Sequence, residues 1–264
     1  MSQYALDVSD KIALNKDQKN IIKTVLAGLN KAKAIYPKID SIGINGGFML
    51  DIILNLEPFD IDIKYSIKSE KSETVRACVC KELQDLTKEL NVWNNKPLDF
   101  GNYLKYPHLP VNLPIYECEI GLFSHQTEYV SMFFLNSDGR IWSNSDALKD
   151  LGNKTYEIRL EGLLIWTGVM KKDYFATLTG TLFRGLGYAH KRAFNFGPKF
   201  KQYIEELPYI VKNINNLTSH KEHFKNYFYT RVGTLENLVN VLEKNNITNK
   251  TSIINTIQSE ILNS

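Results

Sequence analysis

Two aspartates one residue apart, Asp60 and Asp62, have the most distinctive chemistry in this chain. They alternate with Ile61 and Ile63, so in a strand the two carboxylates share one face and the isoleucines the other. Adjacent carboxylates repel each other unless a cation neutralises them. Their oxygens suit Mg²⁺, which also accepts substrate phosphates, and Mn²⁺ takes the same ligands. The pair therefore predicts a metal site for phosphoryl displacement; the alternative is a solvated strand edge.

A glycine pair precedes the aspartates and follows a short apolar strand. Ile42 and Ile44 alternate with smaller residues, and Gly46-Gly47 then breaks the pattern with backbone that no side chain covers. Free N–H groups at the start of a helix suit phosphate oxygens, so the two glycines are candidate nucleotide-binding residues. The alternative is a simple turn. The short helix that should follow buries residues at every fourth position: Phe48, Ile52 and Leu56.

A third carboxylate would complete the metal cluster. Residues 113–123 read as a strand in which Glu117 and Glu119 lie on the face opposite the apolar residues. Either glutamate on a neighbouring strand could join the two aspartates. The alternative is that both are exposed strand positions.

The order of these residues resembles a known family. Gly46-Gly47-Phe48, then Asp51, Glu57-Pro58 and Asp60-Ile61-Asp62, is similar to the nucleotidyltransferase head domain of bacterial-type tRNA CCA-adding enzymes and poly(A) polymerases, within the polymerase-β-like superfamily. The interval from Gly47 to Asp60 is the family's own. The resemblance implies that Asp60, Asp62 and Glu119 are catalytic, that Asp60 and Asp62 hold the metal, and that Asp51 belongs to the nucleotide site.

The sequence departs from the family at positions that contact nucleotides. Leu50 stands where the family has arginine, and His125-Gln126-Thr127 replaces an Arg-Arg-Asp element. The acidic pair and first arginine that select the base align with Thr177, Leu178 and Thr181. Arg184 alone remains of that device and is a candidate nucleotide-binding residue. The resemblance spans about residues 40–200, is strongest at 44–63, and does not imply CCA-specific addition.

Apolar periodicity predicts how the rest of the chain is organised. An amphipathic helix over 15–35 precedes the first strand, and a hairpin combines a strand over 128–135 with its return at 140–142. Helical patterns dominate from about residue 162. The predicted fold is α+β: a nucleotidyltransferase-type mixed sheet with flanking helices over 1–160, followed by an all-helical domain over 161–264.

A basic and aromatic stretch opens the helical part. Residues 171–201 contain seven Lys or Arg against one Asp, with aromatic residues interleaved. Basic side chains neutralise phosphates and aromatic rings stack on bases. The candidate RNA-binding residues are Lys191, Arg192, Lys199 and Lys201. The alternative is a helix with core aromatics and solvated lysines.

Composition sets broad limits. The 264 residues carry a net charge of only +3, so an affinity for nucleic acid would depend on local clustering. Cys78 and Cys80 are too close together for the usual zinc spacing and no second pair follows, so these two and Cys118 are expected to be reduced. With no secretory signal and no apolar run of membrane-spanning length, we expect a cytoplasmic protein without a membrane partner. Residue types do not determine its oligomeric state.

These features favour a metal-dependent nucleotidyltransferase that moves a nucleoside monophosphate from an NTP to an acceptor, with an RNA 3′ end, of tRNA or another RNA, as the expected acceptor. One alternative is a non-catalytic RNA- or nucleotide-binding protein on the same scaffold. Another is a toxin-like transferase that modifies tRNA or protein.

Overall fold

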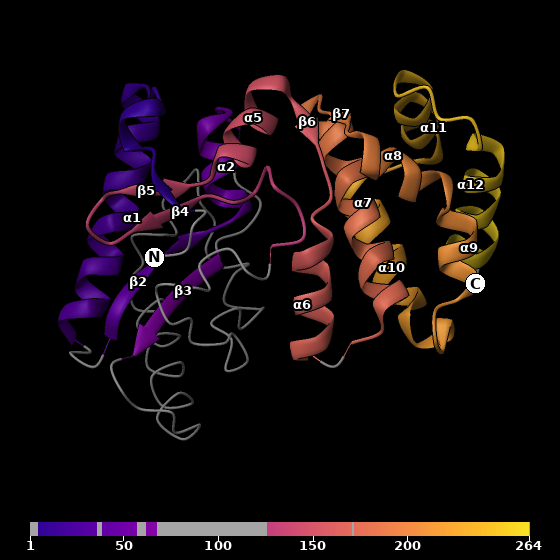
Figure 1. The fold of residues 1–264 in the computed structure, drawn as a ribbon, viewed down its shortest axis with the longest axis horizontal. Helices are drawn as coiled ribbons and strands as arrows, with labels where there is room; N and C mark the ends of the chain where they lie inside the picture. Colours follow the sequence, from indigo (N-terminus) through magenta and orange to yellow (C-terminus); the bar gives the residue numbers. More distant parts are fainter. Residues whose placement is uncertain (1–4, 36–38, 57–61, 68–125, 171, 264) are drawn as a thin grey trace. The chain divides into compact units, whose positions relative to one another are not determined.

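The computed structural model describes residues 5–35, 39–56, 62–67, 126–170 and 172–263 (Figure 1). The chain divides into two compact units. The first comprises Met1–Phe123 and Ser131–Ser145, and the second comprises Ser124–Val130 and Asp146–Ser264. The domain boundary that the sequence predicts at residue 160 stays a prediction.

The first unit is built on a five-stranded sheet of order β1-β5-β4-β2-β3. Its strands are β1 (Leu6–Asp7), β2 (Ile39–Asn45), β3 (Asp62–Ile67), β4 (Phe134–Asn136) and β5 (Ile141–Ser143). All pairings among these five strands are antiparallel. The predicted strand over 113–123 lies outside the described residues, so the mixed character of the sheet stays a prediction.

Two helices accompany strand β2. The long helix α1 (Lys16–Ile35) contacts β2 and buries Ile22, Val25 and Leu29, which confirms the predicted amphipathic helix. The short helix α2 (Gly47–Ile53) follows β2 and also contacts it. The Gln18 side chain donates to the carbonyl oxygen of Ile52 over 2.5 Å, which ties the start of α1 to the end of α2. A short 3-10 turn, η1 (Ser9–Lys11), precedes α1.

The second unit is mostly helical, as the sequence predicts for the C-terminal part. Its elements are α5 (Ser145–Asn153), β6 (Thr155–Tyr156), α6 (Leu160–Met170), α7 (Tyr174–Arg192), β7 (Asn195–Phe196), α8 (Pro198–Glu205), α9 (Leu207–Lys212), α10 (Leu217–Arg231), α11 (Leu235–Lys244), α12 (Lys250–Thr256) and the π-helical turn η3 (Ile257–Leu262). The strands β6 and β7 pair in parallel.

Helix α7 is the centre of this unit, because it contacts α6, α8, α9, α10 and α11. The Asp173 carboxylate caps its first turn by accepting from the backbone N–H of Ala176 over 2.7 Å. The helix runs unbroken through its glycines. A Cβ at Gly185 would lie 2.3 Å from the Phe200 ring, so this glycine permits close packing and does not interrupt the helix.

Within the part of the chain that the structure describes, no helix combines the length and the apolar character needed to cross a bilayer.

Candidate functional site

The glycine bend forms as the sequence predicts. Strand β2 ends at Asn45, Gly46 has φ 80° and ψ −137°, and α2 begins at Gly47. A positive φ favours glycine because it has no Cβ. The N–H of Gly46 donates to the carbonyl oxygen of Phe133 over 2.9 Å, which fixes the bend against the chain before β4. The backbone at this end of β2 is therefore bare and rigidly placed.

The acidic strand runs beside this bend. Strand β3 begins at Asp62, and in the antiparallel register its Cα lies opposite that of Asn45, the residue before the two glycines. The register thus puts residue 62 next to Gly46 at one end of the sheet. Asp60 and Glu119 lie outside the described residues, as does the side chain of Asp62. Among the residues that are described, no group of three or more His, Cys, Asp and Glu could hold a metal ion.

Asn45 has an unusual environment that the sequence reading did not single out. The residue is 2% exposed, and its Oδ1 is buried without a hydrogen-bond partner among the described residues. A buried acceptor left without a donor costs about 1–3 kcal/mol. The signal in the sequence was a polar residue ending an otherwise apolar strand, directly before Gly46-Gly47.

Helix α2 buries Leu50 and Asp51, the two residues at positions where the resembling family contacts nucleotides. Leu50, at the family's arginine position, is 0% exposed and belongs to the core, and Asp51 is 1% exposed. The nucleotide-binding role of Asp51 stays a prediction. The expected burial of Leu56 is wrong, because Asn55 adopts φ 58° and ends the helical segment first, which leaves Leu56 38% exposed.

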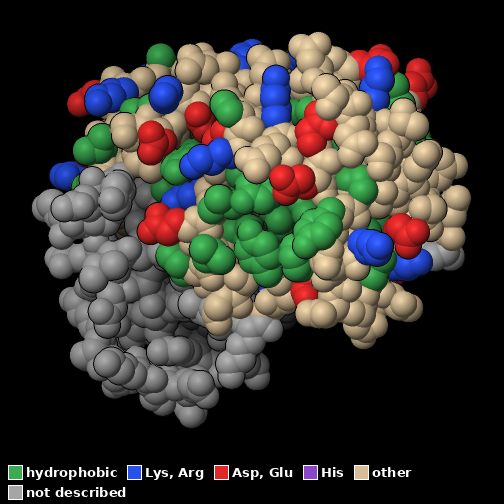
Figure 2. Space-filling view, turned by 45° about the vertical axis from the view of Figure 1, so that its right-hand side comes forward, with side chains coloured by type: hydrophobic (Ala, Val, Ile, Leu, Met, Phe, Trp, Pro, Cys, Tyr) green, Lys and Arg blue, Asp and Glu red, His purple; other side chains and the backbone are tan. Residues whose placement is uncertain are grey.

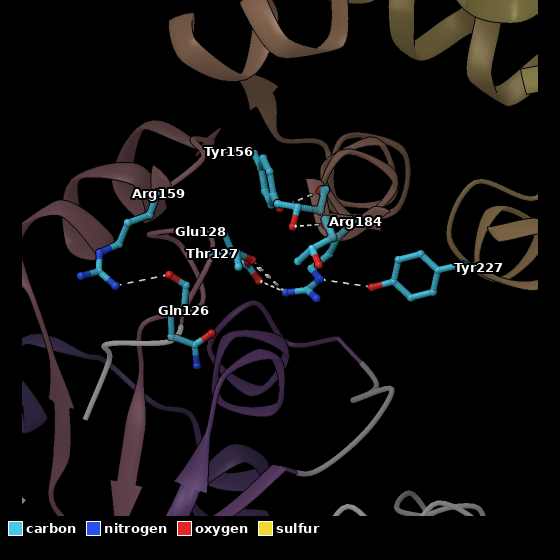
Figure 3. Close-up of polar contacts among 9 residues, drawn as sticks. Gln126, Thr127, Glu128, Tyr156, Arg159, Arg184 and Tyr227 are labelled. Atoms are coloured by element: carbon cyan, nitrogen blue, oxygen red, sulfur yellow. Dashed lines mark hydrogen bonds and ion pairs between the residues drawn. The ribbon is translucent and has the colours of Figure 1, made fainter. Parts of the chain in front are cut away.

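Arg184, in the second unit, lies in a polar cluster (Figure 3). Its Nη1 donates to both carboxylate oxygens of Glu128, at 2.8 and 2.9 Å, and its Nε donates to the Tyr227 hydroxyl at 3.2 Å. The Thr127 hydroxyl also donates to the Glu128 carboxylate. The Glu128 side chain is 2% exposed and that of Arg184 33%. This ion pair therefore joins α7 to the segment before β4.

Electrostatics in this cluster favour its charged pair. Burial is the largest single influence and acts to lower the pKa of Arg184, but Glu128, Tyr227 and Tyr156 together outweigh it, and the net pKa lies well above the ordinary value. Burial, followed by the charge of Glu128, raises the pKa of the fully buried Tyr156 well above its ordinary value. The Tyr156 hydroxyl donates to the Thr181 carbonyl oxygen at 3.3 Å. Arg184 is thus held as a structural cation, and its nucleotide-binding role stays a prediction.

The positions aligned with the family's base-selecting residues are directed at their own helix. The hydroxyl of Thr177 donates to the Asp173 carbonyl oxygen at 2.9 Å, and that of Thr181 donates to the Thr177 carbonyl oxygen at 3.0 Å. Leu178 is 1% exposed. The loss of the family's base-selecting device stays a prediction.

The candidate RNA-binding residues have several structural contacts. Lys191 donates from its Nζ to the carbonyl oxygen of Thr230 near the end of α10, and burial followed by Arg231 and Arg192 lowers the pKa of Lys191. The Arg192 guanidinium lies 4.4 Å above the Tyr188 ring. Arg231, which the sequence reading missed, therefore belongs to this basic group. Lys199 and Lys201 lie on α8.

Figure 2 shows one face of the molecule, on which Lys and Arg side chains are scattered among acidic ones around a patch of hydrophobic side chains. The described residues on that face form no continuous basic field. The RNA-binding role of Lys191, Arg192, Lys199 and Lys201 stays a prediction.

Asp150, on α5, is a titratable group with a strongly perturbed pKa. Its Oδ2 is buried without a hydrogen-bond partner in the described part of the chain. Burial, followed by the charges of Glu157 and Asp146, raises its pKa to about 7, although Lys149 opposes the shift. The Glu157 carboxylate itself accepts from the backbone N–H groups of Lys199 and Phe200, at 3.1 and 2.8 Å, at the start of α8.

Comparisons with known proteins give few matches. No family model matches the sequence, and no curated protein matches it significantly. Solved structures with similar coordinates include the Thermotoga maritima CCA-adding enzyme complexed with tRNA, at 12% identity and a TM-score of 0.45. Complexes of a CCA-adding enzyme with CTP and with ATP are similar at 11% and 14% identity, with TM-scores of 0.44 and 0.43.

Each of these likenesses covers 98% of this chain. They cover 55% of the Thermotoga maritima enzyme and 66% of the chain in each nucleotide complex, so this chain spans between half and two thirds of their length. With every TM-score below 0.5, no conclusion about this chain follows from them.

Proposed function

We propose that this protein is a metal-dependent nucleotidyltransferase that moves a nucleoside monophosphate from an NTP to the 3′ end of an RNA. The observation that carries this proposal is the register between β2 and β3, in which Asp62 stands opposite Asn45 and next to the bend at Gly46. An acidic strand beside a bare-backbone bend brings metal ligands and phosphate-binding backbone to one end of a sheet.

The residues present fit a divalent metal. Asp60, Asp62 and Glu119 supply the hard oxygen ligands that Mg²⁺ and Mn²⁺ accept. The buried Oδ1 of Asn45, without a partner among the described residues, is a further oxygen at the same end of the sheet. When bound, Mg²⁺ would favour ionisation of the acceptor hydroxyl and neutralise charge on the departing pyrophosphate.

The chain's own residues have separate tasks in this reaction. The carboxylates of Asp60, Asp62 and Glu119 would hold the metal, and Asp51 would support the nucleotide site from α2. Gly46 and Gly47 allow the backbone to approach the triphosphate because neither carries a Cβ. The N–H of Gly46 is already bound to Phe133, so direct contact with phosphate would fall to the N–H groups that follow it.

An RNA acceptor is proposed from the second unit. Its basic and aromatic stretch provides Lys191, Arg192, Lys199 and Lys201 as phosphate contacts, with Arg231 added to the group by its effect on the Lys191 pKa. Arg184 stays a candidate nucleotide-binding residue, and a third of its side chain is exposed.

A second candidate function is a non-catalytic RNA- or nucleotide-binding protein. The observations that favour it are the burial of Leu50 in the core and the Glu128 carboxylate that engages Arg184. Leu50 and Arg184 both stand at positions where the resembling family contacts nucleotides. This alternative keeps the scaffold and loses the reaction.

Incubation with each α-³²P-labelled NTP, Mg²⁺ and total RNA distinguishes these functions. Transfer of label to RNA 3′ ends, lost in Asp60→Ala and Asp62→Ala, is the expected result. Asp10→Ala is the matched control, because Asp10 is an exposed aspartate of the same unit and should keep full transfer. Label in protein would point to a toxin-like transferase. No label in any acceptor, with retained NTP binding, would favour the binding protein.

A further inference from the structure

Asn45 lies where three strands meet at one end of the sheet. Its Cα is opposite that of Asp62 on β3 and that of Phe134 on β4, and both pairings are antiparallel. Directly opposed residues of antiparallel strands share a face of the sheet. Residues 45 and 62 therefore share a face, one residue away from the bend at Gly46.

The side chain of Asn45 has no structural role that the described contacts explain. Ile42 and Ile44, each 1% exposed, contribute to the apolar core from the same strand, and an apolar side chain at position 45 would leave no polar atom to satisfy. The buried Oδ1 instead accepts no hydrogen bond from the described residues. In native folds, a buried polar atom without a partner is explained by a catalytic role, by strain, or by a bound water or ion.

The neighbourhood of this oxygen indicates which ligand it takes. An amide oxygen either accepts a hydrogen bond or coordinates a hard cation, and a carboxylate at the paired position favours the cation. We infer that the Oδ1 of Asn45 is an additional oxygen ligand of the divalent ion held by Asp62, directly or through one water. This inference rests on the proposed function and adds a ligand that neither the aspartate pair nor Glu119 provides.

The test is Mn²⁺ binding to the full-length protein, followed by electron paramagnetic resonance, together with the melting temperature in EDTA. Asn45→Leu removes the oxygen, and Asn45→Asp keeps an oxygen and adds charge. Asn136→Leu is the matched control: Asn136 lies on β4, and its Oδ1 already accepts from the backbone N–H of Ser137 at 2.7 Å.

Asn45→Leu should weaken Mn²⁺ binding by about tenfold or more and raise the melting temperature in EDTA, because it removes a buried acceptor without a donor. Asn45→Asp should bind Mn²⁺ at least as tightly as the wild type and melt lower in EDTA. Asn136→Leu should leave Mn²⁺ affinity unchanged and lower the melting temperature.

Several results would overturn the inference. Unchanged Mn²⁺ affinity with a lower melting temperature for Asn45→Leu would assign Asn45 a purely structural role, such as holding a buried water. If Asn45→Leu does not fold, a weaker Mn²⁺ affinity for Asn45→Asp would also refute it. If Asp62→Ala abolishes Mn²⁺ binding and Asn45→Leu leaves it intact, Asn45 is not a metal ligand, but the proposed function stands. A wild-type protein without Mn²⁺ binding overturns both this inference and the proposed function.

Discussion

The end of β2 and the centre of the helical unit differ in whether their buried polar groups have hydrogen-bond partners. At the end of β2, the Oδ1 of Asn45 is buried without a partner among the described residues. Around Arg184, the guanidinium, the Glu128 carboxylate and the hydroxyls of Thr127 and Tyr227 contact one another. Both sites are polar and both are largely enclosed by the fold.

We interpret this difference as one between a ligand site, proposed at the end of β2, and a polar network that the fold itself satisfies around Arg184. A satisfied polar network rigidifies the packing around it, whereas an unsatisfied buried group lowers stability until something binds it. We therefore assign the Arg184 cluster chiefly to stability and the β2 end to binding. The following predictions test that assignment, beginning with the largest expected effect.

Loss of the buried carboxylate should destabilise the helical unit most. Glu128→Ala leaves the Arg184 guanidinium without its counter-ion, and breaking a buried pair costs about 3–5 kcal/mol. Because a third of the Arg184 side chain is exposed, we expect a smaller cost than this, about 2–3 kcal/mol. Urea unfolding followed by circular dichroism measures this difference.

The control is Glu161→Ala in the same unit. Glu161 pairs with Arg159 at 3.0 Å, but its side chain is 73% exposed, so its loss should cost less than about 0.5 kcal/mol. If both substitutions change the free energy of unfolding by equally small amounts, and only Glu128→Ala loses nucleotide binding, the Arg184 cluster serves nucleotide binding and not stability.

Close packing at the centre of α7 gives the next largest effect. In Gly185→Ala the new Cβ would lie 2.3 Å from the Phe200 ring and 2.6 Å from the Tyr156 ring, so overpacking should cost about 1–3 kcal/mol. Gly180→Ala on the same helix meets nothing within 4 Å and should stabilise by up to about 1 kcal/mol. Thermal melts of both variants check the pair, and similar changes in both would contradict the packing described for α7.

Much of the first unit was predictable from sequence because its signals are local. The alternation of Ile42 and Ile44, the glycine pair and the Asp-x-Asp strand predicted β2, the bend and β3, and helical spacing predicted α1. Each of these patterns extends over a few neighbouring residues whose side chains share one face.

The remainder depended on contacts between distant residues. Glu128 and Arg184 are 56 residues apart, and nothing in their local sequence shows that they pair. The alternation over 128–135 predicted one strand, but β4 covers only Phe134–Asn136, because Glu128 forms a separate antiparallel bridge with Ile158. The missing partner of the Asn45 oxygen likewise required coordinates.

A smaller, pH-dependent effect is expected at Asp150. Its pKa is about 7 in the folded protein, against an ordinary value of 3.8, so the unfolded chain ionises first as pH rises. Asp150 therefore leaves the free energy of unfolding unchanged below about pH 4 and lowers it increasingly as the pH rises to about 7. Because the Asp150 side chain is only partly buried, solvent screens much of this loss in stability, so Asp150→Asn should gain about 1–2 kcal/mol at pH 8 and nearly nothing at pH 4, as urea unfolding at both pH values would reveal. A gain that does not depend on pH would refute the raised pKa.

The smallest effect concerns the basic residues. Lys191→Ala removes the contact with the Thr230 carbonyl oxygen near the end of α10 and should cost about 0.5 kcal/mol. Lys199 is exposed, and Lys199→Ala should leave stability unchanged. If these residues bind RNA, each substitution also lowers the slope of log affinity against log salt by about 1. An unchanged slope in both variants would show that these lysines do not contact RNA.

The most direct test of the central claim measures both products of one reaction. Label transferred from an α-³²P-labelled NTP to RNA should appear in equal amount with released pyrophosphate, require Mg²⁺ or Mn²⁺, and disappear in a folded Asp62→Asn variant. A wild-type protein that forms neither product, or an Asp62→Asn variant that forms both at the wild-type rate, would contradict the assignment of nucleotidyl transfer to this end of the sheet.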